Sequence, residues 1–206
     1  MRKLSIYLLI ILLSSQSISA QSNWEKIKIN NWGIIAIPNS MEVQSGLYKK
    51  IADKAKQEFS VNAERVVFQQ KGVNKGENLN TYARVIMRTD YGTETLPNLN
   101  KEILNANDIS DLNSVYKAQL NELSTNSKYP AKIIKWNSVK IITIAGQKCI
   151  NYSYIQQMGN NPQTYSEFYI FWKGKNQYTI NTEYWIRDSE KWKTDISKSI
   201  NSFKFL

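Results

Sequence analysis

Residues 132–186 read KIIKWNSVKIITIAGQKCINYSYIQQMGNNPQTYSEFYIFWKGKNQYTINTEYWI. This region is rich in Ile, Tyr, Phe and Trp, the residue types that favour extended backbone, and turn-forming residues divide it into four segments. The segments are residues 132–144, 148–156, 163–173 and 176–186. The breaks between them, at 145–146, 159–162 and 174–175, are short and have the composition of tight turns. Strands joined so closely must run antiparallel, so the region predicts the centre of a large antiparallel sheet.

Further strands are predicted upstream of this meander. Trp24–Ile29 alternates apolar and polar residues, Asn30 and Asn31 suit a tight turn, and residues 32–37 return to Pro38 as the second strand of a hairpin. Two more strands are predicted at residues 65–70 and 82–89, with a loop rich in Gly and Asn between them.

Apolar residues at helical spacing predict three helices. The first covers residues 41–59, the second runs from about Leu99 to Leu123 with a break near Asn107 left open, and the third begins at Asp188 or Ser189. Each has one apolar stripe, which must be buried against another element. The order of elements therefore predicts an α+β fold, a single largely antiparallel sheet with amphipathic helices on its faces.

The N-terminal residues have the pattern of a secretory signal peptide. Arg2 and Lys3 precede an apolar run of ten residues, 4–13, which is shorter than the roughly twenty residues that a membrane-spanning helix needs. Small and polar residues then lead to Ala20, after which we expect cleavage. We therefore expect residues 1–20 to be removed and residues 21–206 to form a single domain in the periplasm or outside the cell.

The composition argues against several classes of enzyme. The chain has no histidine, which removes serine–histidine triads and nearly every zinc or copper site. Its one cysteine, Cys149, has no partner for an intrachain disulfide and lies in a predicted strand, where a small apolar role is expected. We expect no metal and no cofactor.

The net charge is +10, of which Arg2 and Lys3 supply two, so residues 21–206 carry +8. A basic surface attracts anionic polymers or membrane surfaces. The lysines are spread along the whole chain rather than clustered, which argues against a nucleic-acid partner. An anionic glycan or membrane surface stays open as a partner if folding gathers these cations on one face.

The chain resembles the PsbP-like α/β/α sandwich family, and among its members the secreted bacterial proteins of the DcrB type. The resemblance rests on the segment WGIIAIP at residues 32–38, on the late strands with a turn at Gly146, and on INSFKF at residues 200–205. The predicted helix at residues 41–59 is a departure from the family pattern. The resemblance implies a non-catalytic domain that docks on a larger partner, and it supplies no catalytic motif.

Glu167 and Glu183 are the candidate catalytic residues. They lie one on each strand of the last hairpin, and a facing pair of carboxylates could hydrolyse a glycosidic bond without histidine. A two-residue turn at Gly174 and Lys175 would place Glu167 opposite Thr182, on the other side of the sheet from Glu183. A three-residue turn would bring the two carboxylates face to face. The first register pairs more aromatic residues across the strands and is favoured.

The same hairpin also suggests a binding surface. Its many aromatic residues either pack beneath helices on both faces of the sheet or leave some rings exposed for a partner. Trp185 is the best candidate for an exposed ring, because Asn181 and Glu183, its neighbours on the same strand face, are polar. We therefore predict an exported, non-catalytic accessory domain that binds an unidentified protein through this surface. The alternatives are the carboxylate-based glycoside hydrolase and a binder of anionic polymer or membrane surface.

Overall fold

The computed structural model describes residues 23–29, 32–46, 49–50, 53–54, 63–126 and 130–206. The predicted signal peptide lies outside these residues. No helix in the part of the chain so described is both long enough and apolar enough to cross a membrane.

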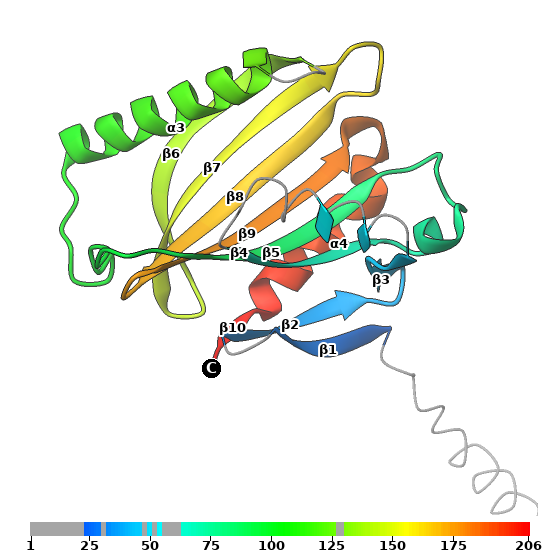
Figure 1. Cartoon of the computed structure of the whole chain (residues 1–206), viewed down its shortest axis with the longest axis horizontal. Helices are drawn as coiled ribbons and strands as arrows, with labels where there is room; N and C mark the ends of the chain where they lie inside the picture. The colour runs from blue at the N-terminus through cyan, green and yellow to red at the C-terminus, as the bar shows by residue number, and fades with distance from the viewer. Residues whose placement is uncertain (1–22, 30–31, 47–48, 51–52, 55–62, 127–129) are drawn as a thin grey trace, which may run out of the picture.

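The centre of the molecule is a seven-stranded sheet in the order β3-β4-β5-β9-β8-β7-β6 (Figure 1). Every neighbouring pair is antiparallel. The strands are β3 (Met41–Val43), β4 (Ala63–Gln70), β5 (Ala83–Tyr91), β6 (Ala131–Ile144), β7 (Gln147–Met158), β8 (Thr164–Lys173) and β9 (Asn176–Trp185). The predicted meander is confirmed, with each of its four strands beginning and ending within two residues of its expected bounds.

The pairing of β8 with β9 follows the favoured register. The turn is Gly174 and Lys175, and Glu167 lies opposite Thr182. Because residues directly opposite share a face, this register defines the two faces of the sheet. We call them the α3 face, which carries Glu183 and lies toward helix α3 (Ala106–Asn126), and the α4 face, which carries Glu167 and lies toward helix α4 (Ser189–Ser202).

Helix α4 (Ser189–Ser202) packs on the α4 face together with a small second sheet. Trp192, Ile196 and Ile200, the predicted apolar stripe of this helix, are at most 5% exposed. The second sheet has the order β1-β2-β10, formed by β1 (Trp24–Ile29), β2 (Gly33–Pro38) and β10 (Lys204–Phe205).

The predicted single sheet is therefore corrected to two. The N-terminal hairpin forms as expected but pairs with the last strand of the chain instead of joining the main sheet. Aromatic packing stabilises this arrangement, because Trp32 lies against the buried ring of Phe203 at 5.2 Å between centroids. Gly33 permits this approach, since a Cβ there would lie 2.2 Å from the Phe203 ring.

Helix α3 (Ala106–Asn126) covers the α3 face over β6 and begins later than predicted. Asn105 caps it, because its Oδ1 accepts from the N–H groups of Asn107 and Asp108, while Asp108 Oδ2 accepts from the Asn105 N–H. Leu99 lies in a turn before the helix yet is only 3% exposed, in an apolar cluster with Val139, Ile150 and Ile170. The apolar pattern thus identified a buried residue but assigned it to the wrong element.

The predicted helix at residues 41–59 is wrong at its start. Met41–Val43 is the edge strand β3, paired with β4. Asn74 stabilises this extended backbone, because its side chain donates to the Val43 carbonyl at 2.9 Å and accepts from the Ser45 N–H at 2.8 Å. Residues 46, 49–50 and 53–54 are helical, and the rest of the predicted helix lies outside the described residues.

Candidate functional site

Five side chains meet on the α3 face where β5 begins and β9 ends. We call them the Glu183 cluster, and they are Tyr82, Arg84, Asn181, Glu183 and Trp185. Glu183 lies opposite Arg84 of β5, and Asn181 and Trp185 flank it on the same face of β9. Tyr82 directly precedes β5, and its carbonyl accepts the Trp185 N–H at 3.1 Å. The predicted binding residues Trp185, Asn181 and Glu183 are therefore brought together.

Both carboxylate oxygens of Glu183 accept hydrogen bonds. The Tyr82 hydroxyl donates to Oε2, and the Asn181 amide donates to Oε1 at 3.1 Å in the orientation that satisfies both of its polar atoms. Burial raises the pKa of Tyr82 well above its usual value of 10, and the negative charge of Glu183 raises it further. The phenol therefore stays neutral at physiological pH and fixes the direction of the carboxylate.

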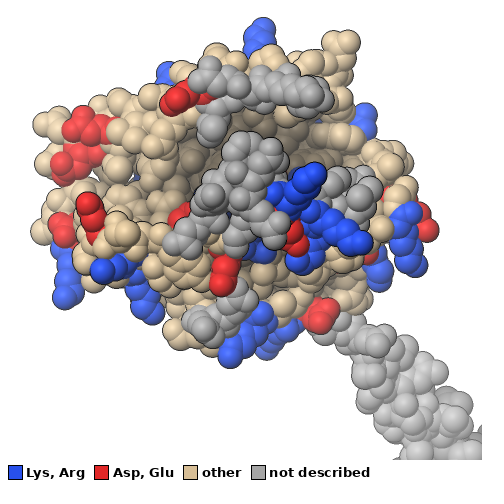
Figure 2. All heavy atoms as spheres, viewed as in Figure 1, with Lys and Arg blue, Asp and Glu red and all other residues tan. Residues whose placement is uncertain are grey.

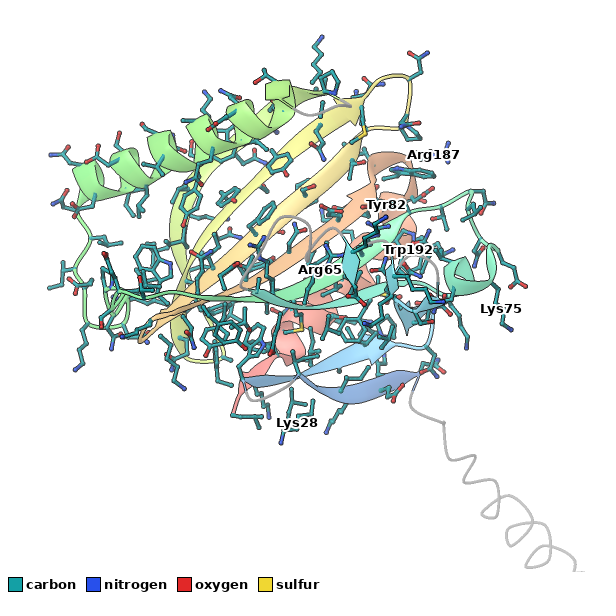
Figure 3. All side chains as sticks on the ribbon, in the orientation of Figure 1. Lys28, Arg65, Lys75, Tyr82, Arg187 and Trp192 are labelled. Atoms are coloured by element: carbon teal, nitrogen blue, oxygen red, sulfur yellow. The ribbon has the colours of Figure 1, made fainter. Side chains whose placement is uncertain are left out.

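The aromatic rings of the cluster lie between two guanidinium groups. Tyr82 stacks on Trp185 with 5.8 Å between centroids, Arg187 covers the Trp185 ring at 4.4 Å, and Arg84 lies 5.2 Å from the Tyr82 ring. Figure 3 shows Tyr82 and Arg187 at the same end of the sheet. Tyr82 and Trp185 are half-buried, so part of each stacked ring is exposed to solvent while its other contacts hold it in place.

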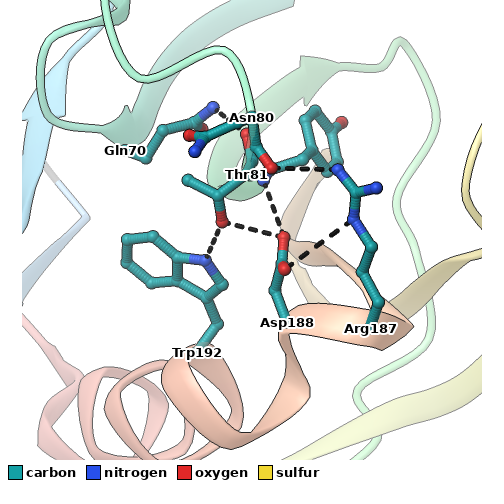
Figure 4. Close-up of polar contacts among 7 residues, drawn as sticks. Gln70, Asn80, Thr81, Arg187, Asp188 and Trp192 are labelled. Carbon is teal, nitrogen blue, oxygen red and sulfur yellow. Dashed lines mark hydrogen bonds and ion pairs between the residues drawn. The ribbon is translucent and has the colours of Figure 1, made fainter.

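A hydrogen-bonded network behind the stack holds it in place (Figure 4). Thr81 donates to Asp188 Oδ2 at 2.8 Å and accepts from the Trp192 indole N–H at 2.8 Å. Arg187 donates to the Asn80 carbonyl at 2.9 Å, and Gln70 donates to the Thr81 carbonyl at 2.6 Å. The loop before β5 is thereby joined to the start of α4, which positions Tyr82 and Arg187 on either side of Trp185.

An aromatic row extends from the cluster toward α3. Tyr152 of β7 stacks between Phe168 of β8 at 4.8 Å and Tyr116 of α3 at 4.9 Å, and Trp136 of β6 lies 5.2 Å from the same ring. The Trp136 indole N–H donates to Asn113 of α3 at 2.9 Å. These rings are half-buried, and Figure 2 shows the surface hollowed on this face below α3. A ligand on this face would therefore meet both aromatic rings and the polar groups of the Glu183 cluster.

Three arginines lie on the α3 face of β4 and β5. Arg65 is directly opposite Arg88, and Arg84 lies on the same face of β5. Partial burial lowers the pKa of Arg65, and the neighbouring charges of Arg84 and Arg88 lower it further. Asp90 pairs with Arg88. Like charges placed opposite each other are unfavourable in a sheet, and the negative charges of Asp53, Asp90 and Glu183 offset part of this repulsion.

The two candidate catalytic carboxylates do not converge. Glu167 lies on the α4 face, where it accepts from Asn151 Nδ2 at 3.1 Å and from the Tyr165 hydroxyl at 3.2 Å. Glu183 lies on the α3 face, so the sheet itself separates the two groups. No substrate can lie between them, and the paired-carboxylate alternative loses the geometry that it required.

Cys149 is buried on the α4 face, and burial raises the pKa of its thiol to about 12, with a further contribution from Glu167. Such a thiol is not a nucleophile at neutral pH. Among the described residues, no three Cys, Asp or Glu side chains are grouped as a metal site.

Sequence reasoning missed Tyr82, Arg84 and Arg187. Each is a common residue type in a segment without a motif. The contacts of Tyr82 and Arg84 with β9 depend on the pairing of β5 with β9, whereas Arg187 follows Trp185 by two residues. Alternation within residues 82–89 does place Tyr82 and Arg84 on one face, which is the only local signal.

Comparison with known proteins identifies the fold. No family model and no curated protein matches the chain. Among solved structures, the cyanobacterial PsbP (CyanoP) of Synechocystis sp. PCC 6803 is 13% identical, with 95% of this chain and 99% of that chain covered and a TM-score of 0.52. The LpqN protein of Mycobacterium tuberculosis is 6% identical over 94% and 96% of the two chains, with a TM-score of 0.45. A Bacteroides thetaiotaomicron protein is 8% identical over 89% of this chain and 49% of its own, with a TM-score of 0.46. The likeness to CyanoP shows that this chain has the PsbP-like fold, as its resemblance to that family predicted.

Proposed function

We propose that this chain is an exported, non-catalytic binding domain that docks on a larger protein of the cell envelope through the Glu183 cluster. The observation that carries the proposal is the stack of Arg187, Trp185, Tyr82 and Arg84, in which two guanidinium groups lie against two half-buried rings. Trp, Tyr and Arg are the residues that contribute most often to the binding energy of protein interfaces. Because the network around Thr81 already orders these side chains, binding would cost little further side-chain entropy.

Two further observations support a binding role. The PsbP-like fold is the one for which the sequence resemblance implied docking on a larger partner, and the N-terminal pattern predicts export. The carboxylates that a histidine-free hydrolase would need lie on opposite faces of the sheet. The polar groups of the cluster also satisfy one another, as Glu183 does with Tyr82 and Asn181, which suits recognition better than proton transfer.

A second candidate function is binding of an anionic polymer or membrane surface. It is favoured by one observation, the placement of Arg65 directly opposite Arg88. Figure 2 shows Lys and Arg side chains near the centre of this view, with Asp and Glu side chains among them. This binding would weaken steeply with salt, whereas an interface centred on Trp185 would depend mainly on buried aromatic area.

The test compares crosslinked pull-downs from the native envelope at low and high salt, using wild type, Trp185→Ala and the matched control Tyr91→Ala. Tyr91 is an exposed ring at the opposite end of β5. We expect one protein to be captured at both salt concentrations by wild type and Tyr91→Ala and to be lost with Trp185→Ala. The purified partner should then bind Trp185→Ala at least about tenfold more weakly.

Capture that is equal for Trp185→Ala and wild type would refute docking through this cluster. Binding only to vesicles of anionic lipid, lost at high salt and weakened by Arg65→Gln, would establish the second candidate instead. Far-UV circular dichroism of each variant checks that the fold is retained.

A further inference from the structure

A separate cavity of about 330 Å³ lies at the other end of β9 from the Glu183 cluster. Its walls come from four segments distant in sequence, namely residues 96–100, the start of β7, the end of β8 with Gly174, and residues 205–206. The volume falls at the lower end of the range for small-molecule sites. The cavity is therefore large enough for a small ligand and is independent of the proposed docking surface.

The cavity is preformed, because backbone hydrogen bonds attach its walls to one another. The Leu96 N–H donates to the Gly174 carbonyl at 2.8 Å, and the Gly92 N–H donates to the Lys175 carbonyl at 3.0 Å. Gly92 is required for this contact, since a Cβ there would lie 2.6 Å from the Lys175 carbonyl oxygen. Residues 92–96 are thus held against the β8–β9 turn without any ligand.

The polar groups that line the cavity are hydrogen-bond donors. Three amide side chains contribute, and each of their oxygens is already engaged. Asn98 Oδ1 accepts the Asn100 N–H at 3.1 Å, Asn100 Oδ1 accepts the Lys148 N–H at 2.7 Å, and Gln147 Oε1 accepts from the Asn100 side chain. The groups left to meet a ligand are therefore the amide nitrogens of Asn98 and Gln147.

Two ammonium groups add to these donors. Lys148 is half-buried, and its ammonium group donates one hydrogen bond to the Glu102 carbonyl at 3.2 Å. Lys173 lies on the rim. No Asp or Glu side chain lines the cavity, and neither lysine forms an ion pair within the described residues. Two ammonium groups in a lining that contains no Asp or Glu side chain favour a ligand that carries a negative charge and acceptor oxygens.

The remaining wall is apolar. Phe171 is 2% exposed, and Trp172, Phe205 and Leu96 complete this side of the cavity. The Trp172 indole N–H donates to Gln177 at 3.2 Å, which fixes the ring. A ligand that satisfied the whole cavity would carry an apolar body beside its charged group.

We propose that this cavity binds a small organic carboxylate with an aromatic or short aliphatic body. The carboxylate accepts from Lys148 and from the free amide nitrogens of Asn98 and Gln147, and Lys173 on the rim adds positive charge. The body lies against Trp172. Because the site is at the opposite end of the sheet from Trp185, its success or failure leaves the proposed docking function unaffected.

The test is a titration of the isotope-labelled protein, followed by the NMR signals of the Trp172 indole N–H and the Gly174 amide. The probes are phenylpropionate, its neutral amide phenylpropionamide, and inorganic phosphate, which has charge without a body. We expect saturable shifts of both signals with phenylpropionate, and binding at least about tenfold weaker for each of the other two probes.

Variants complete the test. Lys148→Gln combined with Lys173→Gln should weaken phenylpropionate binding about tenfold, whereas Lys132→Gln combined with Lys193→Gln removes the same charge elsewhere and should leave it unchanged. Otherwise identical spectra of the variants check their fold. The proposal is overturned if phenylpropionate shifts neither signal at millimolar concentration. It is also overturned if phenylpropionamide binds equally well, or if both double variants bind alike.

Discussion

Replacing Thr81 by Val should lower the free energy of unfolding, because Thr81 joins Asp188 to Trp192 in the network beside the Glu183 cluster. Val has nearly the shape of Thr but no hydroxyl, and Thr81 is only 7% exposed. The change removes the hydroxyl that accepts the Trp192 indole N–H at 2.8 Å and that donates to Asp188. Trp192 is only 1% exposed, so its indole N–H would be buried without a partner. A buried donor left without a partner costs about 1–3 kcal/mol, so we expect a loss of about 2 kcal/mol in the free energy of unfolding.

Urea unfolding measures this loss. With a slope of about 2 kcal/mol per molar urea, the midpoint should fall by about 1 M, and the melting temperature by roughly 4–8 °C. Thr81→Ser keeps the hydroxyl and is the matched control, expected to lose less than about 1 kcal/mol. If Thr81→Val and Thr81→Ser were equally stable, the hydroxyl would not be holding the network and the reasoning would be refuted.

Three other predictions concern single groups. Ala145 has a φ of 52°, which is unfavourable for a residue with a Cβ, so Ala145→Gly should raise the melting temperature through about 1 kcal/mol of relieved strain; an unchanged or lower value would contradict this. Burial raises the pKa of Tyr116, Tyr154 and Tyr165 to about 12, above the value of 10 in an unfolded chain. The stability that these neutral phenols contribute is therefore complete below pH 10 and is lost as the pH rises through about 12. Tyrosinate absorbance at about pH 11 should therefore increase sharply on adding denaturant, and an equal signal from the native protein would refute the shift. The Cys149 thiol, with a pKa of about 12, should not react with a thiol reagent at neutral pH until the chain unfolds, and rapid native labelling would show that it is accessible.

Local patterns predicted much of this fold. The turn at Gly174 and Lys175 was sufficient to give the register of β8 with β9, because a two-residue hairpin turn leaves one pairing that aligns the aromatic residues. The same register separates Glu167 from Glu183. The stripe of Trp192 and its neighbours on α4 was equally local, since residues four apart share one helix face.

Errors arose where long-range contacts outweighed local pattern. Met41 begins a strand although the residues after it have helical spacing, because β4 offers an edge to pair with and Asn74 fixes the turn. Leu99 continues the apolar stripe of α3, yet the helix starts only where Asn105 can cap it. For Leu99, the apolar pattern identified a residue to be buried but not the element that buries it.

The sequence by itself determined the class of fold, the order of the late strands and the face shared by Asn181, Glu183 and Trp185, because each depends on neighbours within one strand or one turn. Only the tertiary structure placed Arg84 opposite Glu183 and Tyr82 against Trp185, since β5 and β9 pair across more than eighty intervening residues. No local period specifies which strand will pair with which at that distance, because the choice depends on how all the apolar faces are buried together. The cavity beside Trp172 likewise exists only after four distant segments have packed.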